Sequence, residues 1–264
     1  MKDAFIAFQR CGKHYGSHVV LEKLNASVQE GEFVTMVGTS GCGKSTFLKM
    51  LLGTETQTTG KLLFNGQPIV AEPSEDRGVV FQKYSVFPHL SVRDNVALGR
   101  EFAESPLLGK LFGQKRRQAL AEADQWLEAV GLAAARDKYP HELSGGMQQR
   151  LAIAQALIKH PKVLLLDEPF GALDPGIRKD MHALILKLWK ENNLTIFMVT
   201  HDLQEAFYLG TRLWVFDWPQ HEAQDSDQHG ATITFDLPIE QRDELQASDL
   251  EFPENESPVL MEVA

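Results

Sequence analysis

The pattern of hydrophobic and polar positions predicts a domain in which strands and helices alternate. Short runs rich in Val, Ile, Leu and Phe are separated by helical stretches, which is typical of an α/β core. Two runs, Val163–Leu166 and Ile196–Val199, are continuously apolar, as expected for strands that are covered on both faces of a sheet. The strands are expected at Phe33–Val37, Lys61–Phe64, Gly78–Phe81, Val163–Leu166, Thr195–Val199 and Arg212–Phe216.

Between about residues 88 and 160 the pattern changes to helical periodicity. Ala119–Val130 and Met147–His160 are predicted to be helices, and no convincing strand lies between them. Pro106, Gly109 and Gly113 mark a loop in this stretch. We therefore expect one α/β domain at residues 1–218, with a helical subdomain at about 88–160 inserted into it.

The net charge of −10 is concentrated near the C-terminus. Residues 222–264 hold twelve acidic side chains and one basic one, whereas the other 221 residues hold 24 acidic and 25 basic ones. Residues 219–264 contain one plausible strand, at Ala231–Phe235, and too few apolar residues for a folded domain of their own. We expect an acidic extension that is either solubilising, the reading we favour, or regulatory.

A nearly neutral body argues against nucleic acid as a partner, because a duplex-binding face carries surplus Lys and Arg. The cluster Lys115–Arg117 fits a solvated helix face; contact with lipid head groups or RNA is the alternative. No stretch approaches the roughly eighteen uncharged apolar residues of a membrane span, and residues 1–10 do not resemble a signal peptide. The two cysteines, Cys11 and Cys42, suit a reducing cytosol, so we expect a soluble intracellular protein.

The strongest chemical motif is Gly38–Ser45 (GTSGCGKS), which matches G-x-x-x-x-G-K-[ST] between a predicted strand and a predicted helix. Glycines allow consecutive backbone N–H groups to surround phosphate oxygens, and the helix N-terminus adds partial positive charge. Lys44 supplies charge to the β- and γ-phosphates, and the Ser45 hydroxyl is a ligand for Mg²⁺. A glycine-rich turn is the alternative. The residues expected to bind the nucleotide here are Gly38, Thr39, Ser40, Gly41, Cys42, Gly43, Lys44, Ser45 and Thr46.

A second motif, Val163–Pro169 (VLLLDEP), is a buried strand that ends in two carboxylates. Ligands of parallel sheets bind at the carboxyl ends of the strands. Asp167 is expected to hold Mg²⁺, and Glu168 is the best candidate to position the attacking water. A surface turn is the alternative for this pair, but the phosphate loop in the same chain favours an ATPase.

The segment Leu143–Arg150 (LSGGMQQR) resembles the LSGGQ signature of ABC ATPases, with Met147 where Gln is commonest. Ser144 is expected to cap a helix whose first turn, with Gly145 and Gly146, exposes backbone donors. A flexible Ser-Gly-Gly turn is the alternative. The substitution leaves Ser144 and both glycines intact and is followed by Gln148.

The resemblance to ABC ATPases covers roughly residues 3–217. Tyr15 resembles the aromatic residue that stacks on adenine, although an ordinary turn tyrosine is the alternative. Gln82 resembles the glutamine that touches Mg²⁺ and the water, and residues 171–174 with Asp174 resemble the D-loop. His201 resembles the switch histidine that contacts the γ-phosphate; alone it would be taken for a structural histidine.

The resemblance implies a P-loop NTPase cassette with a RecA-like core, an antiparallel β edge and a helical subdomain. It also implies hydrolysis of Mg²⁺-bound ATP by a head-to-tail dimer of two copies. Each ATP would lie between the phosphate loop of one copy and Ser144, Gly145, Gly146 and Gln148 of the other. Permease subunits would dock near Tyr84, Val86, Phe87 and Pro88, holding the chain at the cytoplasmic face of the inner membrane.

The segments Ser91–Asn95, His141–Arg150 and Asp167–Asp174 most resemble ABC importers of the nitrate, sulfonate and taurine group. Tyr139–Ala156 and Gly210–Phe216 look closest to subunits associated with urea carboxylase or guanidine use. An importer would also need an extracytoplasmic solute-binding protein. The alternatives are an exporter or lipid-transport ATPase, and a soluble ABC protein acting on ribosomes or DNA.

Overall fold

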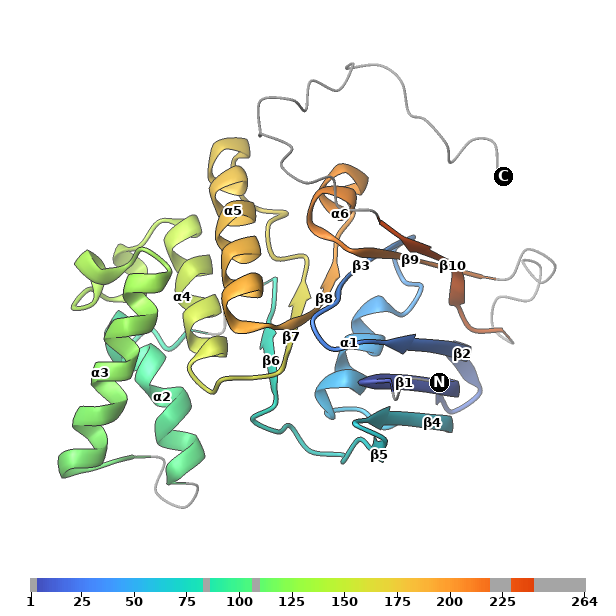
Figure 1. Ribbon diagram of the computed structural model, residues 1–264, viewed down its shortest axis with the longest axis horizontal. Coiled ribbons are helices and arrows are strands. Elements are labelled where there is room, and N and C mark those ends of the chain that lie inside the picture. Colours follow the sequence, from blue (N-terminus) through green and yellow to red (C-terminus); the bar gives the residue numbers. More distant parts are fainter. Residues whose placement is uncertain (1–3, 83–85, 106–109, 219–228, 240–264) are drawn as a thin grey trace.

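The computed structural model describes residues 4–82, 86–105, 110–218 and 229–239. These residues form an antiparallel sheet, a six-stranded sheet and the helices around them (Figure 1). The antiparallel sheet has the order β2-β1-β4-β5, with β1 Ile6–Tyr15, β2 His18–Val28, β4 Thr59–Phe64 and β5 Gln67–Pro68. The six-stranded sheet has the order β10-β9-β3-β8-β7-β6, with β3 Phe33–Gly38, β6 Arg77–Val80, β7 Val163–Asp167, β8 Thr195–Val199, β9 Arg212–Asp217 and β10 Thr232–Pro238.

The central strands of the larger sheet pair in parallel and are covered on both faces. Along β7, Leu164 and Leu166 join the hydrophobic cluster that contains α4 (Gly145–Leu157) and α5 (Pro175–Asn192). The intervening Val163 and Leu165 join the cluster that contains α1 (Lys44–Leu52) and the antiparallel sheet. Because side chains alternate along a strand, α1 and α4 lie on opposite faces of this sheet.

All six strands expected from the apolar runs are present, with ends shifted by at most two residues. The long strands β1 and β2 were not predicted, because register shifts interrupt their alternating pattern and place Arg10 and Lys23 at φ 49° and 51°. The missed helix α2 (Val92–Glu104) begins at Ser91, whose hydroxyl accepts a hydrogen bond from the Asp94 N–H.

Between β6 and β7 the described residues form helices only. The two helices expected there are present as α3 (Gly113–Ala129) and α4. Two short 3-10 turns, η1 Ala133–Ala135 and η2 Pro140–Glu142, precede α4. The carboxamide of Asn95, fully buried in α2, accepts from the Phe87 N–H and donates to the carbonyls of Phe87, Leu90 and Ser91. This side chain therefore fixes residues 87–91, which lead into α2.

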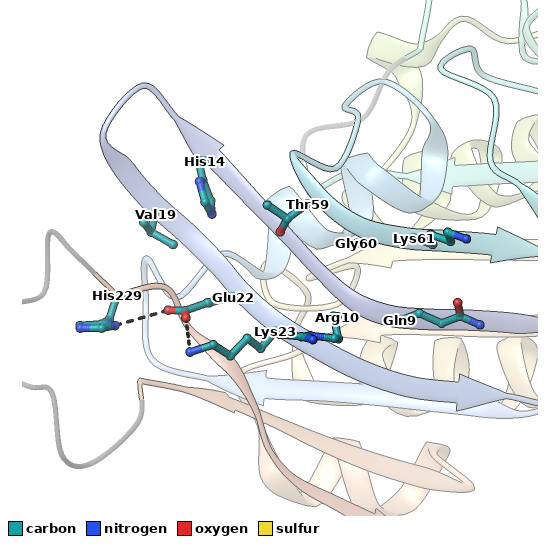
Figure 2. A pocket seen from close by; sticks show the side chains of 10 residues that line it. All are labelled: Gln9, Arg10, His14, Val19, Glu22, Lys23, Thr59, Gly60, Lys61 and His229. Carbon is teal, nitrogen blue, oxygen red and sulfur yellow. Dashed lines mark ion pairs between the residues drawn. The ribbon is translucent and has the colours of Figure 1, made fainter.

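The C-terminal strand β10 continues the six-stranded sheet, and the segment before it touches the antiparallel sheet. Ala231 exchanges backbone hydrogen bonds with β2, and His229 lies beside Glu22 of that strand (Figure 2). Arg212 of β9 binds both carboxylate oxygens of Asp236 at 2.6 Å and the Ser27 carbonyl at 2.7 Å. The strand expected at Ala231–Phe235 is therefore present as β10, and it helps to hold the two sheets together. Residues 219–228 and 240–264 of the acidic extension lie outside the described residues.

Candidate nucleotide-binding and hydrolytic site

The phosphate loop connects β3 to α1 and leaves the start of that helix without a side-chain cap. Its first glycine, Gly38, has φ 149°, and an added Cβ would lie 2.2 Å from the Phe216 carbonyl, so no larger residue fits. The Lys44 ammonium donates to the carbonyls of Gly38 and Thr39 at 2.7 and 2.8 Å. Uncapped N–H groups beside a buried ammonium form a site for an anion.

The other loop residues divide into an exposed and a buried set. Thr39, Ser40 and Gly41 are exposed, whereas the Cys42 thiol is buried and lies 3.4 Å from the Lys44 ammonium. Cys42 thus packs beneath the loop as a small residue.

The side-chain oxygens of Ser45, in the first turn of α1, and Asp167, at the end of β7, lie close together. The Ser45 hydroxyl donates to the Asp167 carboxylate at 3.4 Å. Burial raises the pKa of Asp167, and the charge of Glu168 adds to this effect, while the hydrogen bond from Ser45 opposes it. Among the described residues no group of three His, Cys, Asp or Glu side chains is placed to hold a metal ion. A hydroxyl and a carboxylate nevertheless suit Mg²⁺, which prefers oxygen ligands and completes its shell with phosphate and water.

Glu168, Gln82 and His201 come together at the carboxyl ends of the neighbouring strands β7, β6 and β8. The Gln82 amide donates to one carboxylate oxygen of Glu168 at 3.1 Å, and His201 Nε2 lies 2.5 Å from the other. Glu168 adopts φ 48°, a conformation that non-glycine residues rarely adopt, while its N–H donates to the Val199 carbonyl. The three polar side chains predicted from separate segments therefore form one cluster.

A cavity of about 560 Å³ adjoins this cluster and is lined in part by Glu168, Gly171 and His201. The larger hollow, of about 740 Å³, lies over the antiparallel sheet (Figure 2) and is lined by none of the predicted site residues. Volume alone would therefore misplace the site, and the convergence of polar groups is the better guide.

Tyr15 ends β1 and lies near the phosphate loop. Its side chain is 46% exposed, and the Lys13 ammonium lies 4.8 Å from the ring centroid. Burial and a hydrogen bond to Glu55 raise the pKa of Tyr15, whereas a hydrogen bond with Thr46 of α1 opposes this shift. The structure thus brings Tyr15 and Thr46 together and leaves much of the ring accessible to a flat ligand.

The signature segment begins α4, which packs on the opposite face of the sheet from α1 and its phosphate loop. Ser144 caps α4 by accepting from the Met147 N–H at 3.4 Å, and Gly145 beside it is exposed. Gly146 packs so closely that an added Cβ would lie 2.5 Å from Ile177 of α5.

Gln148 and Asp174 complete the set of predicted residues. The Gln148 amide donates to the carbonyls of Pro140 and Leu143, so in this conformation it holds the loop before α4. Asp174 is the exposed N-cap residue of α5 and makes no capping hydrogen bond. Two side chains that the sequence did not single out, His182 and Glu205, form a hydrogen bond; His182 lies in no predicted motif, and Glu205 lies four residues after His201.

Comparison with known proteins agrees with this geometry. The family model for the ABC transporter matches residues 21–171, more than half of the chain. The chain belongs to the ABC transporter family. The fold expected from the motifs, an ABC cassette, is also that of a solved dimeric ATP-binding cassette in a post-hydrolysis state with bound ADP and phosphate. That structure is 28% identical with a TM-score of 0.70, over 89% of this chain and 99% of its own.

Three relatives of this ABC family member are importer subunits by name. The nitrate import ATP-binding protein of Synechocystis is 44% identical over 200 residues, which cover 76% of this chain and 71% of the relative. The aliphatic sulfonates import ATP-binding protein of Bacillus cereus is 41% identical over 76% of this chain and 75% of its own. The spermidine/putrescine import ATP-binding protein of Chromobacterium violaceum is 40% identical over 85% of this chain and 60% of its own. In the part of this chain that the structure describes, no helix is long and apolar enough to cross a membrane.

Asp167→Asn is expected to stabilise the nucleotide-free protein at neutral pH. Since the folded-state pKa of Asp167 is raised, its ionised form costs stability above that pKa, and the cost disappears as the pH falls through it. We expect a melting temperature a few degrees higher than that of the wild type, since 1 kcal/mol corresponds to about 2–4 °C in a protein of this size.

The same variant should lose the further stabilisation that Mg²⁺ and ATP give the wild type. Asp180→Asn, which alters an exposed carboxylate on α5, is the matched control and should change neither quantity. A lower melting temperature for Asp167→Asn at pH 7, or full stabilisation by Mg²⁺ and ATP, would contradict this account.

Proposed function

We propose that this chain is the ATP-hydrolysing subunit of an ABC importer for a small solute. The observation that carries the proposal is the cluster in which the Glu168 carboxylate lies between the Gln82 amide and the His201 imidazole. A carboxylate held on both sides at the edge of a phosphate loop is placed to orient and polarise a water molecule against the γ-phosphate.

The remaining residues serve binding and charge neutralisation. The Lys44 ammonium, which donates to the carbonyls of Gly38 and Thr39 in this structure, would donate to phosphate oxygens when ATP binds. Tyr15 would stack on the adenine. Ser45 and Asp167, with Gln82, would hold Mg²⁺, which would supply positive charge to the phosphate oxygens. His201 contacts the γ-phosphate and, with Glu168, confines the attacking water.

Each chain contributes half of a hydrolytic site. The exposed residues Ser144 and Gly145 stand at the start of α4, on the other face of the sheet from Lys44. In a head-to-tail dimer, this helix start would meet the nucleotide held by the second copy; the solved cassette with bound ADP and phosphate is dimeric. Asp174 would lie at the same interface. Splitting the site in this way couples hydrolysis to closure of the dimer.

The path for the solute belongs to permease subunits. Phe87 is 39% exposed on the loop that Asn95 fixes directly after the Gln82 segment, so this loop with Val86 and Pro88 is the proposed dock; Tyr84 lies outside the described residues. The docked chain would lie at the cytoplasmic face of the inner membrane, with a solute-binding protein on the other side. Apart from β10 and the segment that leads into it, residues 219–264 would act as a solubilising extension.

The solute is proposed to be a nitrate- or sulfonate-like anion, or a related nitrogen compound such as urea or guanidine. The nitrate relative supports the anion. The relative named for spermidine and putrescine, which are cations, is nearly as similar. Two ATP-binding subunits of similar sequence are thus named for solutes of opposite charge. We infer that the ATP-binding subunit does not select the solute and that the permease and the solute-binding protein do.

Glu168→Gln is predicted to keep ATP affinity and to lower the rate of hydrolysis by at least about 100-fold, because the amide cannot polarise the water. ATP should then trap a closed dimer, measurable by size-exclusion chromatography alongside phosphate release. Glu191→Gln, an exposed glutamate of α5, is the control. Hydrolysis at the wild-type rate in Glu168→Gln would remove Glu168 from this role.

Import is tested by purifying the chain from membranes with its associated subunits. We predict that it co-purifies with a permease and that one solute, added with its binding protein, stimulates ATP hydrolysis several-fold. Nitrate, an alkanesulfonate, urea and guanidinium are the first solutes to compare. Stimulation by a lipid or hydrophobic compound without a binding protein would favour an exporter. Recovery of the chain with ribosomes or DNA alone would favour the soluble class.

A further inference from the structure

A hydrogen-bond network around a buried carboxylate adjoins the segment of His201. The carboxylate of Glu205, in α6 (Leu203–Leu209), is 6% exposed. One of its oxygens lies 2.7 Å from His182 Nε2 on α5, and the other accepts from the Thr200 hydroxyl at 2.5 Å. A carboxylate so deeply buried needs these partners, because losing one leaves a desolvated charge unpaired.

The network holds the chain on both sides of His201. Thr200 precedes this histidine and is tied to Glu205 through its hydroxyl, which also accepts from the Asp202 N–H at 3.1 Å. Asp202 follows it and accepts from the Glu205 N–H at 3.1 Å. His201 itself is exposed, and its ring meets Glu168. Both chain neighbours of this exposed ring are therefore anchored.

The same network reaches the D-loop through α5. Arg178 lies one helical turn before His182, on the same side of the helix. Its guanidinium donates to the Leu173 carbonyl at 3.3 Å and lies 3.6 Å from the Asp202 carboxylate. The ring of Phe170, two residues after Glu168, packs edge-on against His182 with centroids 5.2 Å apart. The start of α5 thus joins the segment of Glu168, the D-loop and the segment of His201.

We propose that His182 and Glu205 are positioning residues that hold the His201 ring against Glu168, and that Arg178 couples this arrangement to the D-loop. The inference rests on the proposed role of His201 in hydrolysis. A partner copy that moves the D-loop would shift the start of α5 and, through Arg178 and His182, the ring of His201. Hydrolysis would then respond to dimer closure through this network.

The test is a double-mutant cycle between His182 and His201, with hydrolysis measured under single-turnover conditions. His182→Leu is expected to lower the rate about 10- to 100-fold, the effect of a misplaced catalytic group, with the KM for ATP unchanged. His182→Gln, whose amide can still donate to Glu205, should retain most of the activity. In the His201→Ala background, His182→Leu should cause no further loss, because its effect passes through His201.

An equal loss in both backgrounds would show that His182 is merely structural and would overturn the proposal. Full activity of His201→Ala would instead contradict the proposed role of His201 in hydrolysis. Hydrogen exchange would then test whether the network exists, independently of ATP hydrolysis. The amides of Asp202 and Glu205 should exchange at least about 10-fold faster in His182→Leu than in the wild type or in the exposed control Lys187→Leu. Unchanged exchange would overturn the network. If His182→Leu folds poorly, Glu205→Gln permits the same measurement with the same two outcomes.

Discussion

Burial of the parallel strands β7 and β8 on both faces is the constraint on which the rest of the structure depends. Strands covered on two sides carry apolar residues at nearly every position, so polar groups are confined to their ends. Asp167 ends β7 and Glu168 follows it, Thr200 and His201 follow β8, and Gln82 follows β6. The parallel order β3-β8-β7-β6 places these ends beside the phosphate loop after β3. The burial that stabilises the sheet also concentrates the charges that the chemistry needs.

Grouping charged side chains at the buried strand ends is energetically unfavourable, as Asp167 and Glu168 show. Burial raises the pKa of Asp167, and Glu168 adopts an uncommon backbone conformation. Both features would suit a site that binds a cation, whose positive charge would favour the ionised carboxylates. Strain of this kind persists because the neighbouring strands determine the position of the segment.

Much of this arrangement could be predicted from the sequence, because the motifs are local. The phosphate loop is one contiguous segment, and so is the pair Asp167 and Glu168. Their residue types follow from phosphate and magnesium chemistry, and each segment follows an apolar run that predicts a strand. The strands β1 and β2 escaped prediction because bulges at Arg10 and Lys23 break their alternation. The Gln148 amide turns toward its own loop, and His182 meets Glu205 only through the packing of α5 on α6. No local pattern encodes contacts made by tertiary packing.

The central claim is that each chain holds half of a hydrolytic site, with Lys44, Glu168 and His201 in one half and Ser144 in the other. Mixing two inactive variants tests it directly. Lys44→Ala disables the phosphate loop, and Ser144→Arg blocks the signature helix, so neither homodimer should hydrolyse ATP. A mixed dimer would contain one site with an intact loop from one copy and an intact signature from the other. The account predicts that mixing restores a substantial fraction of wild-type ATP hydrolysis; no recovery on mixing, or full activity of Ser144→Arg alone, would contradict it.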